Sequence, residues 1–448
     1  MYKKHLLLPL LVSLFLSLTV LSCTKNPEEL NLDPETEALV SILQDELVPL
    51  DTDPLSWEDQ DLRWLDPIAG KSVVALGEST HGTAEFFEAK HRIFRYLAEN
   101  HGYKIFAIEA DFGESLFIDE AVQLGNTAEI EELMKSKMHF WTWKTEEVKD
   151  LLEWMCTYNQ GKSEEEKVHY MGVDCQFNTY HPDMAMDYLS STGIPFQAYA
   201  DSILQVAETA TEKNFESYSS ESFASYLQEV ESLQDSMILY KDILVGASSE
   251  KEYELNIRIV ELVRQVSEVR YYSLTQQSSI NYRDKYMAEN TSWLLDYYDG
   301  EMIVLWAHNM HIANLEYGVT GMMGNYLSYE LGDQYATIGF LFSQGTFTAV
   351  GMDGENYTEL ETQTLDTAPK ENSLNAIMHY AGEPAFSIEI EALHNYLGWF
   401  NAFEQGMEYF QMGSVYNKRP GDYYTVFDPD YFHYMIYFDK STASELLK

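Results

Sequence analysis

Positive charge is scarce in this chain of 448 residues, where 28 lysines and arginines stand against 73 aspartates and glutamates and the net charge is −45. A field of that sign repels nucleic acids and bare anionic membranes, so we expect neither as a partner. Cysteine is also scarce, with three residues and no spacing typical of a zinc site. Cys156 and Cys175 could pair in an exported protein, or they could stay apart as two buried thiols.

Two common hydrolase signatures are missing. The sequence contains neither the H-E-x-x-H pattern of zinc proteases nor the G-x-S-x-G elbow that presents a nucleophilic serine. Ser79 lies in Gly77-Glu78-Ser79-Thr80, which is not such an elbow. A serine nucleophile is therefore disfavoured.

The N-terminus has the layout of an export signal. Lys3 and Lys4 precede an apolar run from Leu6 to Leu21, and Ser22-Cys23 follows directly. A cysteine after a small residue resembles a bacterial lipoprotein signal, so we predict that Cys23 becomes the lipidated first residue. A transmembrane anchor is the alternative, but the run is short for a span. The predicted location is outside the cytoplasm, with the N-terminal lipid as the only attachment to a membrane.

Short apolar runs alternate with helical patterns from residue 71 onward. The runs predicted as buried strands are 73–76, 105–108, 168–173, 302–307 and 335–342, with 386–390 and 434–438 as further candidates. Helices are predicted over 84–100, closed by Gly102, and over 112–124, closed by Gly125. This alternation predicts an α/β fold with a largely parallel sheet flanked by helices.

A long polar stretch, 182–300, interrupts the alternation. Its period is helical, most clearly over 223–244 and 253–272. We predict a helical insertion domain that caps the cleft. The full division is then a signal peptide over 1–22, a flexible tether over 23–45, a first core part over 46–181, the insertion over 182–300 and a second core part over 301–448.

Acidic residues and histidines follow the predicted strands. They are Glu78 and His81 after the first strand, Glu109 after the second, Asp174 after the third, and His308, Asn309 and His311 after the fourth. Ligands of open parallel sheets bind outside the carboxyl ends of the strands. An acid at one strand end is often a helix cap. Four strand ends carrying such groups together favour an active site.

His81 is the candidate general base, because imidazole can take a proton from water near neutral pH and return it to a leaving group. Glu78, three residues earlier, could orient the ring or share the water. Gly77 and Gly82 flank the pair and would let the backbone approach a ligand closely. Lys90 lies on the apolar stripe of the next helix, so we expect it to reach Glu78 or Glu109, or else to extend from the edge of the stripe.

His308 and His311 are three residues apart and share a face if a helical turn follows the strand. Together with Glu78 and His81 they could bind a divalent metal. They could equally form an acid/base set that needs no metal. No cofactor is required by the pattern, and a divalent metal stays an open alternative.

Five motifs follow one another along the chain: Gly77-Glu78-Ser79-Thr80-His81-Gly82 with Lys90, Ile108-Glu109, Gly172-Val173-Asp174-Cys175-Gln176, Arg283 to Asn290, and Trp306-Ala307-His308-Asn309-Met310-His311. Together they resemble the signatures of the erythromycin esterase family. The resemblance implies an α/β core with a helical domain over the cleft. It also implies hydrolysis of a carboxylic ester, which in the type members is the macrolide lactone ring of an antibiotic.

The resemblance further implies that His81 activates water, that Glu78 and Glu109 assist, and that His308 polarises or positions the ester. We expect Lys90, His311, Asp174 and Asn309 to bind the substrate. Lys90 stands where the resistance enzymes carry arginine, and a lipoprotein signal is unlike a cytosolic resistance enzyme. Another ester or amide is therefore an alternative substrate, and a surface protein that binds a ligand without turnover is an alternative function.

Overall fold

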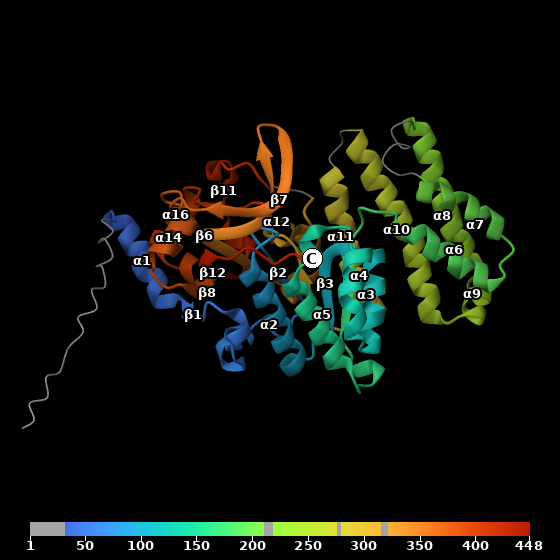
Figure 1. The fold of residues 1–448 in the computed structure, drawn as a ribbon, viewed down its shortest axis with the longest axis horizontal. Coiled ribbons are helices and arrows are strands. Elements are labelled where there is room, and N and C mark those ends of the chain that lie inside the picture. The colour runs from blue at the N-terminus through green and yellow to red at the C-terminus, as the bar shows by residue number, and fades with distance from the viewer. Residues whose placement is uncertain (1–31, 210–217, 276–278, 315–320) are drawn as a thin grey trace, which may run out of the picture.

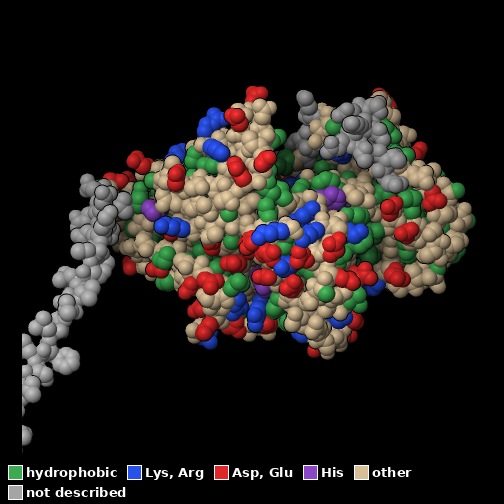
Figure 2. Space-filling model, in the orientation of Figure 1, with side chains coloured by type: hydrophobic (Ala, Val, Ile, Leu, Met, Phe, Trp, Pro, Cys, Tyr) green, Lys and Arg blue, Asp and Glu red, His purple; other side chains and the backbone are tan. Residues whose placement is uncertain are grey.

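The computed structural model describes residues 32–209, 218–275, 279–314 and 321–448. The predicted signal peptide and Cys23 lie outside these residues. Within the described part of the chain, no helix combines the length and the hydrophobicity needed to cross a membrane. Acidic side chains are spread over the face shown in Figure 2, as the net charge of −45 leads one to expect.

The centre of the fold is a parallel sheet with strand order β12-β6-β2-β5-β3-β4. Its strands are β2 (Val73–Leu76), β3 (Ile105–Asp111), β4 (His169–Asp174), β5 (Ile303–Trp306), β6 (Tyr335–Asp353) and β12 (Tyr434–Ser441). The strand β8 (Ala385–Glu389) extends the sheet antiparallel to β12, and β1 (Val48–Pro49) pairs with β8. The predicted α/β fold with a largely parallel sheet is confirmed.

Each central strand is buried on both faces because helices cover both. Val74 and Leu76 of β2 pack into one apolar cluster, whereas Val73 and Ala75 pack into another on the opposite face. The first cluster includes α2 (Ala84–His101), α4 (Thr127–Lys137) and α5 (Glu146–Asn159), and most of the apolar face of α3 (Phe112–Leu124). The second includes α1 (Pro34–Glu46), α13 (Met323–Leu331), α14 (Leu374–Tyr380) and α16 (Leu397–Glu404).

The helix α2 leads from the candidate catalytic loop, and its end agrees with the sequence. Gly102 follows it with φ of 79°, a left-handed conformation that glycine adopts without a steric penalty, and its N–H bonds the carbonyl of Leu97. Leu97, Ile93, Ala89 and Phe86 form its buried stripe. This packing fixes the start of α2, and with it the loop that follows β2.

Between β4 and β5 the chain forms a series of helices with an apolar core of their own. They are α6 (His181–Thr192), α7 (Gln197–Thr209), α8 (Ser220–Leu239), α9 (Lys241–Ala247), α10 (Glu250–Leu274) and α11 (Ser279–Tyr297). Figure 1 shows α6 to α9 at one end of the elongated molecule, while α10 and α11 lead back toward the sheet. Buried side chains of α11, such as Met287 and Leu294, join the core of the sheet.

The strand β6 is longer than the sequence indicated. We predicted that it ends at residue 342, but it continues to Asp353 and pairs antiparallel with β7 (Asn356–Leu365). Figure 1 shows this hairpin projecting from the sheet. Most of β7 is exposed, so its residues are polar and carry no apolar run from which a strand could be predicted.

The tether predicted over 23–45 was wrong from Pro34 onward. Asp33 caps α1 by accepting hydrogen bonds from the N–H groups of Glu35 and Thr36, at 2.9 and 3.1 Å. Pro34 then occupies the first turn, where its missing N–H is harmless. Leu39 and Leu43 are buried against the core, so the segment is part of the fold.

The two cysteines are free and buried. Cys156 lies in α5, where its thiol bonds the carbonyl of Ala121, and Cys175 follows β4. Of the two alternatives, separate thiols describe this protein.

The close contact of Gly82 with β6 leads to a stability prediction. A Cβ at this position would lie 2.0 Å from the carbonyl oxygen of Thr348, and Gly82 itself accepts hydrogen bonds from Thr348 and Ser444. Gly82 is thus needed for contact with β6, not for contact with a ligand. We expect Gly82→Ala to lower the free energy of unfolding by about 1–3 kcal/mol in urea denaturation.

The matched control is Gly246→Ala in α9, where a Cβ would meet no atom within 4 Å. Gly246 is the last residue but one of the helix, so the substitution is expected to leave the free energy of unfolding unchanged or slightly higher. Equal effects of the two substitutions would show that the contact with Thr348 does not constrain the loop.

Candidate active site

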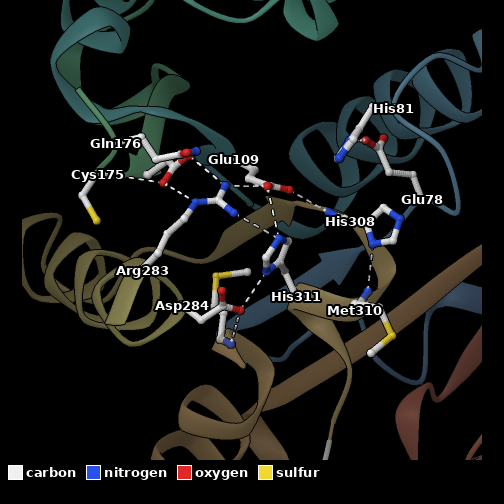
Figure 3. A network of polar contacts seen from close by, with 12 residues as sticks. Glu78, His81, Glu109, Cys175, Gln176, Arg283, Asp284, His308, Met310 and His311 are labelled. Atoms are coloured by element: carbon white, nitrogen blue, oxygen red, sulfur yellow. Dashed lines mark hydrogen bonds and ion pairs between the residues drawn. The ribbon is translucent and has the colours of Figure 1, made fainter. Parts of the chain in front are cut away.

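The predicted site residues meet at the carboxyl ends of β2, β3, β4 and β5 (Figure 3). Figure 3 shows Glu78, His81 and His308 on one side and Arg283 on the other, with Glu109 and His311 between them. The positions follow from the parallel sheet, whose strands all end at one edge.

Glu78 is fully buried and both of its oxygens are occupied. Oε1 lies 2.6 Å from Nδ1 of His81. Oε2 accepts hydrogen bonds from Lys90, at 2.8 Å, and from the indole of Trp306, at 2.6 Å. Burial raises the pKa of Glu78, but Lys90 and His81 outweigh it and hold the pKa below the ordinary value.

This contact fixes the tautomer of His81. A carboxylate only accepts hydrogen bonds, so Nδ1 of His81 carries the proton that faces Glu78. In the neutral ring Nε2 is then an acceptor, and it has no hydrogen-bond partner among the described residues. The side chain of His81 keeps 15% of its surface exposed. His81 therefore presents a bare nitrogen, which is the requirement for a general base.

Lys90 has no exposed surface. Its ammonium lies 4.4 Å from the ring centre of Trp306 and 4.9 Å from that of Phe340, in addition to the ion pair with Glu78. Burial lowers the pKa of Lys90 to about 8 in spite of Glu78. The expectation that Lys90 reaches Glu78 is confirmed, and the alternative that it extends to solvent was wrong. Full burial leaves Lys90 no surface for the expected contact with the substrate. Lys90 holds Glu78 in place.

His308 presents a proton where His81 presents a lone pair. Its side chain caps α12 (Asn309–Ile312), since Nδ1 accepts a hydrogen bond from the N–H of Met310 at 3.3 Å. The proton of the neutral ring is therefore on Nε2, which is buried and has no partner in the described chain. Burial and the neighbouring His81 and His311 lower the pKa of His308 to about 3, so the ring stays neutral. The rings of His81 and His308 lie 5.2 Å apart.

Glu109 is locked as an anion. Its Oε2 accepts the backbone N–H of His308 at 2.9 Å, and its Oε1 lies 2.6 Å from Arg283 and 3.3 Å from Nε2 of His311. Burial raises its pKa, but His311 and Arg283 bring the pKa well below the ordinary value. A group held in this way positions His308 and does not transfer protons.

Arg283 is a site residue that sequence reasoning missed. It comes from α11 and donates to Glu109 and, through two nitrogens, to Asp174 at 2.9 and 2.8 Å. Asp174 is fully buried in this pair, so the expectation that it binds substrate was wrong. Two acids at neighbouring strand ends require a cation, and that requirement was the available signal.

His311 lies between two acids. Its Nδ1 is 2.7 Å from Asp284, a second residue that sequence reasoning missed, and its Nε2 faces Glu109. Burial lowers the pKa of His311, but Glu109 and Asp284 outweigh it and raise the pKa above the ordinary value. Both ring nitrogens are thus engaged, because Nε2 also lies 3.3 Å from Nη1 of Arg283. His311 has no nitrogen left for the substrate contact that we expected.

Asn309 has a structural role instead of the predicted substrate contact. Its amide donates to the carbonyl of Phe340 at 2.9 Å and accepts from the N–H of the same residue at 3.1 Å. A Cβ on Gly77 would lie 2.0 Å from the Oδ1 atom of Asn309. Gly77 is thus required by Asn309 and not, as we expected, by a ligand.

The described residues contain no group of three or more histidine, cysteine and acidic side chains arranged to hold a metal ion. At the cluster of Glu109, Asp174 and His311 the guanidinium of Arg283 already supplies the cation. The nitrogen of His81 that faces Glu78 is likewise occupied. Glu78 and His311, two of the four residues considered for a divalent metal, are thus already paired within the chain.

Comparison with known proteins places the chain in a family. The sequence model of the erythromycin esterase family matches residues 98–441. That range includes Glu109, Arg283, His308 and His311, while Glu78 and His81 precede it. Erythromycin esterase type II of Escherichia coli is 26% identical over 333 residues, which cover 68% of this chain and 75% of that protein. The putative hydrolase YbfO of Bacillus subtilis is 26% identical over 380 residues, which cover 76% of this chain and 79% of that protein.

Solved structures share the fold. A Bacillus cereus protein superposes with a TM-score of 0.79 at 22% identity, covering 92% of this chain and 99% of that one. A succinoglycan biosynthesis protein superposes with a TM-score of 0.76 at 22% identity, and the match covers the same shares of the two chains. A mutant of the erythromycin esterase EreC in its open conformation superposes with a TM-score of 0.69 at 15% identity, covering 90% of this chain and 99% of that one.

The buried pair of Glu78 and Lys90 leads to a stability prediction. Lys90→Met leaves the carboxylate buried without its cation, so we expect the free energy of unfolding to fall by about 3–5 kcal/mol in urea denaturation. Adding Glu78→Gln should restore much of the loss. The control is Lys135→Met, whose pair with Glu131 is on the surface and should contribute little. A loss no larger than that of the control would mean that Lys90 does not hold Glu78.

The neutral state of His308 predicts a dependence of stability on pH. Its pKa of about 3 lies below the ordinary value of 6.5. At a pH between these two values, His308 is therefore protonated in the unfolded chain and neutral in the folded protein. Stability therefore falls as the pH drops from 6.5 toward 3, by about 1.4 kcal/mol per pH unit for this one group. We therefore expect the free energy of unfolding, measured by urea denaturation between pH 6 and 4, to depend less steeply on pH in His308→Gln than in the unchanged protein, by that amount per pH unit. An unchanged slope would contradict the assignment.

Proposed function

The chain belongs to the erythromycin esterase family, and we propose that this hydrolase cleaves a carboxylic ester or lactone with water that His81 activates. The proposal rests on one observation, made on rings 5.2 Å apart. Nδ1 of His81 faces the carboxylate of Glu78, whereas Nδ1 of His308 accepts from the N–H of Met310, so the two contacts assign opposite tautomers. One ring offers a bare nitrogen to a water molecule and the other offers an N–H to a carbonyl oxygen. An ester group between them would meet both.

In the proposed reaction, Nε2 of His81 removes a proton from water as the water oxygen forms a bond to the acyl carbon. The carbonyl oxygen gains negative charge and accepts a hydrogen bond from Nε2 of His308. The bond between the acyl carbon and the alkoxy oxygen then breaks, and the imidazolium of His81 gives its proton to that oxygen. The products are a carboxylic acid and an alcohol, or a hydroxy acid from a lactone.

The surrounding charges support these two rings. Glu78 keeps the proton of His81 on Nδ1 and stabilises the imidazolium that forms during the reaction. Its own position is set by Lys90 and Trp306. Glu109 holds the backbone of His308, and Arg283 holds Glu109. These are positioning residues, because their charged atoms are engaged with one another.

A macrolide lactone is one candidate substrate, because a relative in Escherichia coli carries the name erythromycin esterase type II. The presence of lysine at position 90, where the resistance enzymes carry arginine, does not exclude it. Lys90 contacts Glu78 and is fully buried, so the exchange alters the support of the base and not the contact with the substrate.

The test is a panel of aryl esters, lactones and amides. We expect His81→Ala to lower kcat/KM for esters by about 10²–10⁴-fold. His308→Leu removes the donor to the carbonyl oxygen and should lower kcat by about 10²–10³-fold, whereas His308→Gln keeps an N–H and should lose less. Ester turnover by His81→Ala at the rate of the unchanged protein would overturn the assignment of the base.

The matched control for the panel is His379→Ala, since His379 pairs with Asp439 away from the site. It should leave turnover unchanged. Treatment with a chelator is also expected to leave turnover unchanged, and a loss that Zn²⁺ restores would contradict the metal-free reaction.

A further inference from the structure

Gln411 is a buried residue whose polar atoms lack partners. The residue is 9% exposed, and neither Nε2 nor Oε1 of its amide has a hydrogen-bond partner within the described chain. Folded proteins rarely leave a buried amide unpaired, because the desolvated donor and acceptor destabilise the fold. Such a group calls for a partner from outside the chain, and its position indicates what that partner is.

The segment that carries Gln411 runs along the loop of the proposed base. The N–H of Met412 donates to the carbonyl of Ser79 at 2.7 Å. Gly413 follows, and a Cβ at that position would lie 3.8 Å from Nε2 of His81. Gln411 is therefore within two residues of the nitrogen that activates water.

The direction of the Gln411 side chain follows from strand alternation. Its N–H bonds the carbonyl of Tyr423 at 2.8 Å, which continues the pairing of β9 (Glu408–Phe410) with β11 (Tyr424–Val426). Phe410 and Met412 both pack into the core cluster on one side, so Gln411 projects to the opposite side, with Tyr409. The hydroxyl of Tyr409 lies 3.5 Å from Sδ of Met310, the residue whose N–H binds His308.

We infer that Gln411 binds the substrate beside His81, and that the substrate is an ester with neighbouring hydroxyl groups. This inference rests on the proposed ester hydrolysis. An amide presents a donor and an acceptor side by side, and a vicinal diol satisfies both at once. A site built around such a pair discriminates strongly against an analogue that lacks the hydroxyls, because the buried amide then stays unpaired.

The experiment compares matched esters with and without a diol. One pair places the diol on the alcohol side, glyceryl butanoate against propyl butanoate. The other places it on the acyl side, 4-nitrophenyl 3,4-dihydroxybutanoate against 4-nitrophenyl butanoate. We expect kcat/KM of the unchanged protein to favour the diol at least ~10-fold in one pair. Gln411→Met should bring that ratio close to one, because it loses more activity on the diol ester than on the plain ester.

Gln265→Met is the matched control. Gln265 lies in α10, is fully buried, and also has both amide atoms without partners in the described chain. Replacing either amide by an apolar side chain should leave Tm unchanged or higher, since an unpaired buried group is removed. Only Gln411→Met should change the diol preference. If Gln411→Met does not fold, Gln411→Asn replaces it in the experiment. This substitution withdraws the amide by one methylene and is expected to lower the preference for the diol ester.

Two results would overturn the inference: no diol preference of the unchanged protein in either pair, or a preference that survives in Gln411→Met. The proposed function fails by a different result, namely ester turnover that does not depend on His81. Loss of the diol preference alone leaves the hydrolysis of plain esters intact, so the two proposals can fail separately.

Discussion

The site depends on the carboxylate of Glu78, a buried anion that three donors share. Lys90 and the indole of Trp306 hold one oxygen, and the other faces His81. The donors come from α2, from β5 and from the loop that joins β2 to α2. Two elements of the core thereby fix one carboxylate, and that carboxylate fixes the tautomer of His81. A buried carboxylate is stable only with such partners, so the fold and the base depend on each other.

A second network of polar contacts holds His308 in position. Glu109 binds its backbone, and Arg283, Asp174, His311 and Asp284 continue the polar network across the sheet edge. Because Arg283 and Asp284 come from α11, the network also ties the helical segment between β4 and β5 to the sheet. The fixed charges stay charged and engaged with one another, while the two rings proposed to carry out the reaction have free nitrogens. This division of roles separates proton transfer from charge stabilisation.

The fold was largely predictable because its signals are local. The run Val73 to Leu76 is apolar throughout since both faces of β2 are buried, and Gly102 marks the end of α2 through its own backbone conformation. The hairpin with β7 was not predictable in this way, because exposed strands are polar. Most of α1 fell within the predicted tether, although a proline in the first turn, such as Pro34, is compatible with a helix.

The site was predictable in position and in the contacts of Glu78 with His81 and Lys90, but not in its other contacts. Parallel strands bring Glu78, Glu109, Asp174 and His308 to one edge whatever their detailed packing. The roles of Lys90, Asn309 and Asp174 depend on which way each side chain points, and Arg283 depends on how a distant helix returns to the sheet. Periodicity contains neither kind of information. Polar residues on an apolar stripe, such as Lys90, still indicate that a buried partner exists.

The measurement that tests the account most directly is the ¹⁵N NMR spectrum of the protein with labelled histidine, assigned by single substitutions of His81 and His308 at neutral pH. The account predicts opposite tautomers. His81 should carry its proton on Nδ1 and have a bare Nε2, because Nδ1 faces Glu78. His308 should carry its proton on Nε2 and have a bare Nδ1, because Nδ1 accepts from Met310. Two rings with the same tautomer, or a proton on Nε2 of neutral His81, would contradict the division between base and donor on which the proposed hydrolysis rests.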